Sequence, residues 1–248
     1  MKTFYVEKLK EPMKRTQPRM RKTFQMYSKS CILRDKETHE IVAVFLKKAI
    51  PKEYIRIGRQ MIRFKRKTVR KTISDSSDPI WTTLVGRSFP KYIPPGYLSP
   101  ATKYDLKLFH GDAKKLMLFF EIFMKEYVPE DYKDMVQLSK KIPKSHQIGK
   151  AWHTFQINYD YHSKYHKDSS DTSQYSIVAP FYDFEGAEIV LPAYRCVFPA
   201  KEGDLVLMNQ HEMHGNLPLR KGHRLSVIPY THSGFKHYRK EVVPHHNV

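Results

Sequence analysis

Short apolar runs separated by turn-forming residues dominate the second half of the chain. Gly, Pro, Asp and Asn stand between runs that are rich in β-branched and aromatic residues: 174–181, 187–191, 195–199, 205–208 and 225–230. This spacing is typical of short antiparallel strands that close into a barrel or jelly roll. The pattern therefore predicts a mainly β (α+β) fold with flanking helices.

The first half of the chain adds one hairpin and one helix to this prediction. Two apolar runs, 30–34 and 41–46, flank a polar segment at 35–40, which is the pattern of a β-hairpin that could extend the main sheet. Residues 112–128 contain a long, helix-like apolar stretch. That stretch is too short, and too closely flanked by charged residues, to span a bilayer. We expect a buried helix that packs against the barrel.

Candidate metal ligands lie inside the β-rich half. His166 and Asp168 form an H-x-D pair, and alternate side chains on an extended segment point to the same side, so both could bind one ion from a single strand end. A third ligand must then come from a distant strand that folds back beside the pair. His211 and His214 both follow the strand at 205–208, and either could reach the metal. Two histidines and one carboxylate with open metal positions are typical of non-haem iron oxygenases.

A candidate binding site for a dicarboxylate co-substrate follows these histidines. Arg224 stands ten residues after His214, and its guanidinium could hold the far carboxylate of 2-oxoglutarate in a bidentate fork, which a lysine does less well. Ser226 lies on the same strand face and could donate to the same carboxylate. Zinc is the competing metal, but zinc sites prefer His and Cys in a closed tetrahedral set. Cys31 and Cys196 are too few and too scattered for such a set, which favours iron(II) with 2-oxoglutarate.

These motifs, in this order, resemble the TET/JBP family of iron(II)/2-oxoglutarate-dependent dioxygenases, which oxidise the methyl group of 5-methylpyrimidines in nucleic acid. The resemblance is carried by WHTFQIN at 152–158, HKDSSD at 166–171, FEGAEIVLP at 184–192, GD at 203–204, HG at 214–215, GHRLSV at 222–227 and YTH at 230–232. It covers residues 152–232 clearly and the first 150 residues only loosely. Ala187 departs from the double glycine that is common in the family, and we expect the fold to absorb this change.

The resemblance implies roles for the candidate residues. His166, Asp168 and His214 match the family's iron ligands, and Arg224 with Ser226 matches its 2-oxoglutarate-binding residues. Dioxygen is the remaining co-substrate. The expected frame is a double-stranded β-helix, the cupin-like jelly roll, with the metal at its open end.

Two further positions, Asp171 and His232, match residues that contact the flipped base in this family. A carboxylate at Asp171 suits cytosine, because it can accept a hydrogen bond from the exocyclic N4 amine, whereas thymine presents an acceptor at O4. Asp171 could instead cap a turn, as residues in Ser-Ser-Asp sequences commonly do. We expect oxidation of the C5 methyl of 5-methylcytosine in DNA to 5-hydroxymethylcytosine, with base flipping. Three alternatives stay open: thymine hydroxylation to 5-hydroxymethyluracil, an oxygenase acting on RNA or protein, and a non-catalytic nucleic-acid-binding barrel.

Positive charge is concentrated at the N-terminus. The formal net charge is +19, and residues 1–72 hold 22 Lys/Arg against 6 Asp/Glu. Basic clusters occur at 14–15, 19–22 and 63–67. This asymmetry favours a polyanionic partner, and we expect residues 1–72 to contact double-stranded DNA. A basic surface kept for solubility, or contact with an anionic membrane, is the alternative interpretation.

Length and cysteine content set the expected organisation. At 248 residues the chain fits a single oxygenase domain, 1–248, with a metal- and 2-oxoglutarate-binding jelly-roll core at 150–235. Two cysteines imply neither a disulfide framework nor a zinc module. The sequence shows no signal peptide, lipidation motif or transmembrane run, so we expect no membrane association. We expect an intracellular monomer, nuclear if the source is eukaryotic and cytoplasmic otherwise.

Overall fold

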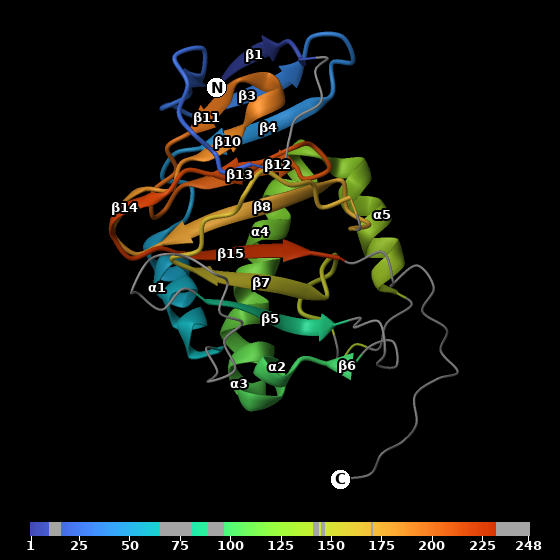
Figure 1. Cartoon of the computed structure of the whole chain (residues 1–248). Coiled ribbons are helices and arrows are strands. Elements are labelled where there is room, and N and C mark those ends of the chain that lie inside the picture. Colours follow the sequence, from blue (N-terminus) through green and yellow to red (C-terminus); the bar gives the residue numbers. More distant parts are fainter. Residues whose placement is uncertain are drawn as a thin grey trace.

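The computed structural model describes residues 1–9, 16–64, 81–88, 97–140, 144, 147–169 and 171–231. Within them, a nine-stranded sheet runs through the molecule in the order β1-β3-β4-β12-β8-β15-β7-β5-β6 (Figure 1). Its strands are β1 Lys2–Val6, β3 Cys31–Asp35, β4 Ile41–Leu46, β5 Trp81–Ser88, β6 Tyr97–Leu98, β7 Thr154–Tyr159, β8 Tyr175–Phe181, β12 Leu205–Asn209 and β15 Leu225–Tyr230. The edge strand β1 pairs with β3 in parallel, and the other neighbours in this sheet pair antiparallel.

A smaller β layer faces one side of this large sheet. In the described part of the chain it consists of a four-stranded sheet, β13-β10-β11-β2, and a two-stranded ribbon of β14 and β9. Its strands are β2 Gln25–Met26, β9 Phe184–Gly186, β10 Ile189–Leu191, β11 Cys196–Phe198, β13 Gly215–Asn216 and β14 Leu219–Gly222. Val206 and Met208 of the large sheet share one buried cluster with Ile189 and Leu191 of the small sheet. The two layers therefore form a jelly roll with an apolar interior.

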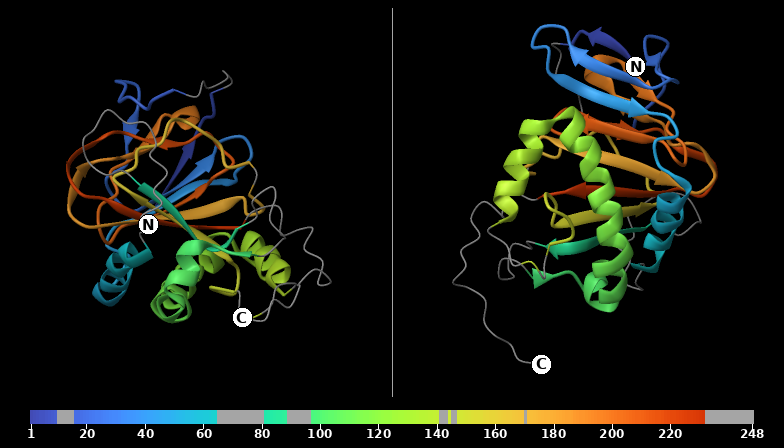
Figure 2. Two further views of the ribbon diagram at one scale, coloured as in Figure 1. Left: turned by 60° about the horizontal axis from the view of Figure 1, so that its bottom comes forward. Right: turned by 180° about the vertical axis from the view of Figure 1, so that it is seen from behind.

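Helices cover the opposite face of the large sheet, as the view from behind shows (Figure 2). They are α1 Lys52–Gln60, α2 Pro100–Tyr104, α3 Leu106–Leu108, α4 Lys114–Tyr127 and α5 Pro129–Ser139, with a 3-10 turn at Met61–Phe64 and a π-helical turn at Phe109–Ala113. On α4, the spacing of Met117, Phe120 and Met124 places all three on one buried face. None of the helices within the described ranges is both long and apolar enough to cross a membrane.

Side-chain alternation along the central strands separates the core from a cavity. On β15, Leu225 and Val227 join the helices in the main hydrophobic cluster, whereas Ser226 and Ile228 line a cavity on the other side of the sheet. The cavity-facing positions of β7 and β8 include polar residues: Gln156, Asn158 and Ser176. The same strands thus bury an apolar face and present polar groups to a site.

The hydrophobic pattern predicted several elements and missed others. The strand expected at 225–230 is β15, and the expected hairpin is confirmed, because β3 pairs with β4 and β4 continues the large sheet through β12. The helix expected at 112–128 is α4, Lys114–Tyr127. The pattern did not reveal β5 and β7, because polar and apolar residues are mixed along both strands and lie on two different faces of the sheet. Predicted residues His232, Lys14 and Arg15, and positions 65–67 of the cluster at 63–67, lie outside the described residues.

Candidate active site

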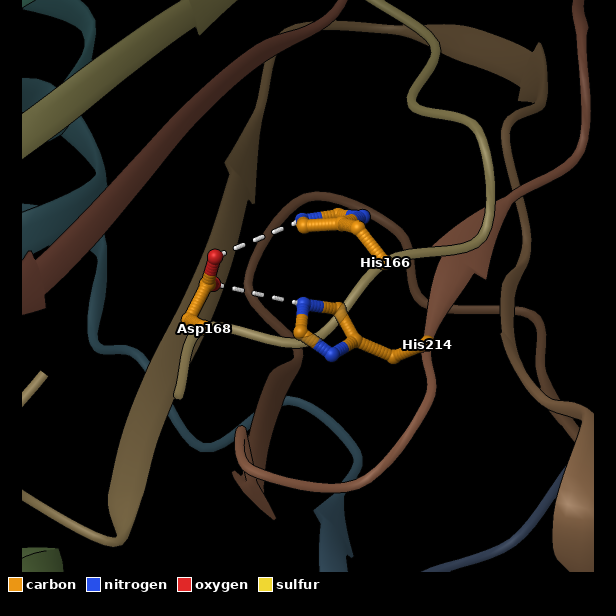
Figure 3. Close-up of side chains that lie close together, drawn as sticks. All are labelled: His166, Asp168 and His214. Atoms are coloured by element: carbon orange, nitrogen blue, oxygen red, sulfur yellow. Dashed lines mark ion pairs between the residues drawn. The ribbon is translucent and has the colours of Figure 1, made fainter. Parts of the chain in front are cut away.

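The side chains of His166 and Asp168 meet that of the distant His214 beside the jelly-roll interior (Figure 3). His166 and His214 form an isolated antiparallel bridge, in which each backbone amide donates to the other's carbonyl at 2.9 Å. The carboxylate oxygens of Asp168 lie 3.7 Å from Nε2 of His166 and 3.5 Å from Nε2 of His214. One potential ligand atom from each residue lies within 4.8 Å of the other two, so the group could hold one metal ion.

The backbone fixes the orientation of both imidazole rings. Nδ1 of His166 lies 2.8 Å from the carbonyl oxygen of Lys164, and Nδ1 of His214 lies 2.9 Å from that of Glu212. Because a carbonyl can only accept, Nδ1 of each ring carries a proton, which leaves Nε2 of each ring as the atom that can bind a metal. Nε2 of both rings faces the Asp168 carboxylate. A histidine that binds a metal through one ring nitrogen commonly donates a hydrogen bond from the other, and this bond sets the tautomer of the ring.

The structure differs from the sequence expectation in how His166 and Asp168 are presented. They lie in the loop between β7 and β8 and not at a strand end. The bridge to His214 anchors His166. Asp168 is anchored by a hydrogen bond of 3.0 Å from its backbone amide to the Gln210 carbonyl. Of the two histidines considered as third ligand, the geometry selects His214. The ring of His211 is turned elsewhere, with Nε2 3.1 Å from the Asp171 carbonyl oxygen.

The electrostatic environment keeps the Asp168 carboxyl group ionised. Burial acts to raise its pKa, but the hydrogen bond and the charge of His214, together with His166, outweigh burial and lower the pKa below the ordinary value. An ionised carboxylate beside two imidazole rings is a donor set of nitrogen and oxygen atoms, which suits iron(II).

A cavity of about 380 Å³ lies beside these ligands. This volume is within the usual range of small-molecule sites. The large sheet supplies much of its wall, and the small sheet contributes Ile189 and Asn216. The cavity brings together six of the seven residues that the sequence singled out: His166, Asp168, Asp171, His214, Arg224 and Ser226.

Arg224 and Ser226 present unpaired polar atoms in this wall. Arg224 is 6% exposed, and its Nε has no hydrogen-bond partner among the described residues; the buried Oγ of Ser226 has none among them either. A buried donor without a partner costs about 1–3 kcal/mol, so a ligand with acceptor oxygens would complete the site. Burial lowers the pKa of Arg224 to about 10, which still leaves the guanidinium charged at neutral pH. A carboxylate of 2-oxoglutarate fits both donors.

Two acidic residues surround Arg224 without forming a hydrogen bond to its guanidinium. Asp160 accepts the Arg224 backbone amide through Oδ1 at 2.7 Å, and its Oδ2 lies 2.7 Å from Nδ1 of His223. Buried Glu188 is paired with Arg220, whose Nη2 lies 2.8 Å from Oε1. Because both carboxylates have other partners among the described residues, the Arg224 guanidinium remains available for a ligand.

Asp171 lines the same cavity, three residues beyond Asp168. Its backbone amide donates to the Asp168 carbonyl at 3.0 Å, and its carboxyl group forms no hydrogen bond with a described residue. The carboxyl group therefore faces the cavity and does not cap the turn. Burial and the Asp168 carboxylate raise the pKa of Asp171 to about 8. A divalent cation on the three ligands would oppose this shift.

Sequence reasoning named no aromatic residue for the site, and the structure supplies two. Tyr161 and Tyr230 both line the cavity. Tyr230 lies close to the acidic groups, since burial together with Asp171 and Asp168 raises the pKa of its hydroxyl. The strand at 225–230 was predicted, and alternation from Ser226 places Tyr230 on the cavity face. That signal could have identified it.

Asn158 is a third residue that the sequence did not reveal. Its Oδ1 accepts hydrogen bonds from Oγ1 of Thr82 at 2.8 Å and from Nε2 of Gln156 at 2.7 Å. The amide orientation is thereby fixed, with the NH₂ group directed away from these two donors. Asn158 is paired with Ser226 in the sheet, which makes it a neighbour of the predicted 2-oxoglutarate-binding residues.

Comparison with known proteins supports the fold. No protein-family model and no curated protein matches the chain. Among solved structures, NgTET1 in complex with 5mC DNA superposes with a TM-score of 0.67 at 15% sequence identity, covering 94% of this chain and 84% of that chain. The fold is that of the iron(II)/2-oxoglutarate oxygenases. The predicted double-stranded β-helix with flanking helices is therefore confirmed.

Two other solved structures superpose with lower TM-scores. An oxidoreductase of the 2OG-Fe(II) oxygenase family from Burkholderia pseudomallei has a TM-score of 0.48 at 17% identity, covering 76% of this chain and 84% of that chain. OsALKBH1 has a TM-score of 0.45 at 12% identity, covering 76% of this chain and 97% of that chain. The His-Asp-His group and the unpaired donors of Arg224 and Ser226 fit the iron and 2-oxoglutarate of this class.

Proposed function

We propose that this protein is an iron(II)/2-oxoglutarate-dependent dioxygenase that hydroxylates the C5 methyl of 5-methylcytosine in double-stranded DNA. The observation that carries the proposal is the content of one cavity: a candidate metal group, unpaired donors at Arg224 and Ser226, and the Asp171 carboxyl group. The likeness in fold to a protein solved with 5mC DNA supports the choice of substrate.

Each candidate residue has its own role in this reaction. His166, Asp168 and His214 would hold the metal, and the backbone bridge between the two histidines keeps these side chains in position. Arg224 and Ser226 would bind the far carboxylate of 2-oxoglutarate and so orient the co-substrate. When bound, iron and 2-oxoglutarate supply the oxidation of a C–H bond by dioxygen, with succinate and carbon dioxide as co-products.

The substrate base must leave the duplex to reach this cavity. In a duplex the C5 methyl lies in the major groove within the base stack, and flipping costs a few kcal/mol. We assign base contact to Asp171, with Tyr230 as the aromatic surface on the same wall and His232 as a second polar contact. An ionised Asp171 accepts from cytosine N4. In its protonated form Asp171 could donate to O4 of thymine, so thymine is the second candidate.

The test is mass spectrometry of nucleosides after incubation with iron(II), 2-oxoglutarate and duplex DNA that contains 5-methylcytosine. Duplex DNA with thymine alone is run in parallel. We expect the unmodified protein to form 5-hydroxymethylcytosine and Asp168→Ala to form none. The control variant Glu185→Ala, which removes an exposed carboxylate on β9, should still form the product. Formation of 5-hydroxymethyluracil instead would show that the substrate base is thymine and not 5-methylcytosine. Succinate without any oxidised base would direct the search to RNA or protein substrates.

A further inference from the structure

The basic N-terminal third does not act as one surface in the folded chain. Several of its cations are already paired: Lys8 with Glu212, Lys47 with Asp204, Arg59 with Glu202 and Arg63 with Asp105. Exposed Lys52 and Arg56 lie on α1, on the helix-covered side of the large sheet (Figure 2). The cavity lies on the other side of that sheet. Only part of this charge can therefore contact a substrate that enters the cavity.

One basic segment, residues 16–24, lies directly against the metal-ligand loops. The carbonyl oxygen of Thr16 accepts the backbone amide of Tyr165 at 2.9 Å, and Tyr165 precedes His166. Pro18 is buried beside Gly215, which follows His214: a Cβ added at Gly215 would lie 2.9 Å from Cγ of Pro18. This segment thus touches both strands of the His166–His214 bridge.

The segment is also fixed at its far end. The amide of Phe24 donates to the Arg21 carbonyl at 3.0 Å, which closes a turn, and the amide of Gln25 donates to the Arg195 carbonyl at 2.8 Å. Gln25 then enters β2, which pairs with β11. A backbone tied at both ends presents its side chains without a large loss of conformational entropy on binding.

Three of the nine side chains on this segment are cations. Arg19, Arg21 and Lys22 are exposed, and none forms an ion pair with a described residue. Arg21 is close enough to Tyr165 to oppose the rise in its pKa that burial causes. Lys164 and Lys167, on either side of His166, are exposed as well. Unpaired positive charge therefore borders the metal ligands.

We propose that residues 16–24 form a phosphate-binding segment that holds the nucleic-acid backbone next to the nucleotide in the cavity. Arg19, Arg21 and Lys22 contact the phosphates, and Lys164 and Lys167 extend the same surface. The inference rests on the proposed function in one respect, which is that the substrate is a nucleic acid. A basic surface kept only for solubility would need neither the two backbone anchors nor a place beside the ligands.

The test compares two variants that remove equal charge from different places. Arg19→Gln/Lys22→Gln removes one arginine and one lysine from the segment; Lys52→Gln/Arg56→Gln removes the same pair from α1. Binding to a fluorescent 20-bp duplex with one 5-methylcytosine is measured by anisotropy across a range of salt concentrations. Thermal unfolding of both variants, which alter exposed side chains only, establishes that each is folded.

We expect the segment variant to bind roughly 10- to 50-fold more weakly near 0.1 M salt, with a slope of log K against log salt that is smaller by about 1.8, because each lost phosphate contact removes about 0.9. The α1 variant should keep the slope of the unmodified protein. Equal losses in both variants, or no loss in the segment variant, would overturn the inference and leave the proposed function intact. Failure of the unmodified protein to bind DNA at any salt concentration would instead count against the proposed function.

Discussion

Asp160 and Arg224 are joined by two hydrogen bonds, one to the Asp160 side chain and one between the two backbones. The Arg224 amide donates to Oδ1 of Asp160 at 2.7 Å, and the Asp160 amide donates to the Arg224 carbonyl at 2.8 Å. Asp160 follows β7 and Arg224 precedes β15, so this pair closes the end of two paired strands. It places the guanidinium in the cavity wall before any ligand is bound. We therefore expect Asp160 to act as a positioning residue for the co-substrate.

The contribution of Asp160 can be measured by substitution. Asp160→Ala removes the acceptor of the Arg224 amide, and it also places alanine at a backbone φ of +51°, where Asp and Asn are tolerated better. Loss of one such hydrogen bond costs about 1–1.5 kcal/mol, so we expect 2-oxoglutarate to bind about tenfold more weakly. Calorimetric titration of the metal-loaded protein measures this. Asp160→Asn should restore binding, and equal weakening in both variants would refute the positioning role.

The donors of Arg224 and Ser226 lead to a second prediction. Arg224→Lys keeps the charge but loses the planar fork, so 2-oxoglutarate affinity should fall about 10- to 100-fold, because a hydrogen bond to a charged group contributes about 1.5–3 kcal/mol. Ser226→Ala should weaken binding less. Its unpaired hydroxyl is already an unfavourable feature of the ligand-free protein, so the variant should unfold at the same temperature or higher. Unchanged affinity in both variants would place the co-substrate elsewhere.

Metal binding should stabilise the fold. A ligand present at 100 times its dissociation constant adds about 2.7 kcal/mol to the unfolding free energy, which for a chain of this size raises Tm by about 5–10 °C. We expect this shift when iron(II) is added without oxygen, and its reversal by a chelator. Asp168→Ala should abolish the shift, whereas Glu185→Ala should retain it. A shift that survives Asp168→Ala would mean that the metal binds at another group.

The candidate site was more predictable from the sequence than the fold around it. His166, Asp168 and His214 carry chemistry that few residue types supply, so their order and spacing identify them even across long loops. The strand pairing of β7 and β5 gave no such signal. Gln156 and Asn158 interrupt the apolar pattern of β7 because they face the cavity, and that interruption conceals the strand.

Tertiary contacts also identified the third candidate metal ligand, which the spacing of residues alone left open. His211 and His214 follow the same strand, and only the bridge to His166 shows which ring faces Asp168. The basic residues of the first 72 positions looked uniform in the sequence. Folding pairs some of them with acidic residues from distant segments and leaves Arg19 and Lys22 exposed near the ligands. Long-range pairing of this kind has no local pattern.

Asp171 should control which base is oxidised. Its carboxyl group faces the cavity without a described hydrogen-bond partner, so Asp171→Ala removes a contact to substrate and leaves the metal and co-substrate groups in place. We expect oxidation of 5-methylcytosine to fall at least tenfold, while the iron-dependent rise in Tm persists. Asp171→Asn, which can donate as well as accept, should shift the product ratio toward oxidised thymine in nucleoside mass spectrometry. His232→Ala tests the second base contact in the same assay. Full activity of Asp171→Ala on 5-methylcytosine would show that Asp171 does not contact the substrate base.

Glu121 gives a prediction on stability that is independent of the metal. It is 4% exposed on α4, and its Oε1 accepts the amides of Lys150 at 2.6 Å and Ala151 at 2.8 Å. Burial raises the pKa of Glu121 despite these hydrogen bonds. The folded state therefore retains the proton to higher pH than the unfolded state, and the unfolding free energy must fall as pH rises above the ordinary carboxyl range.

Glu121→Gln keeps the accepting oxygen and removes the titration. Urea unfolding between pH 4.5 and 8 should show the two proteins diverging, with the Gln variant gaining stability relative to the unmodified protein as pH rises. Glu121→Leu leaves both backbone amides without an acceptor and should lose about 2–6 kcal/mol at every pH. A stability difference between the unmodified protein and Glu121→Gln that is constant with pH would show that this carboxyl group has the same pKa in both states.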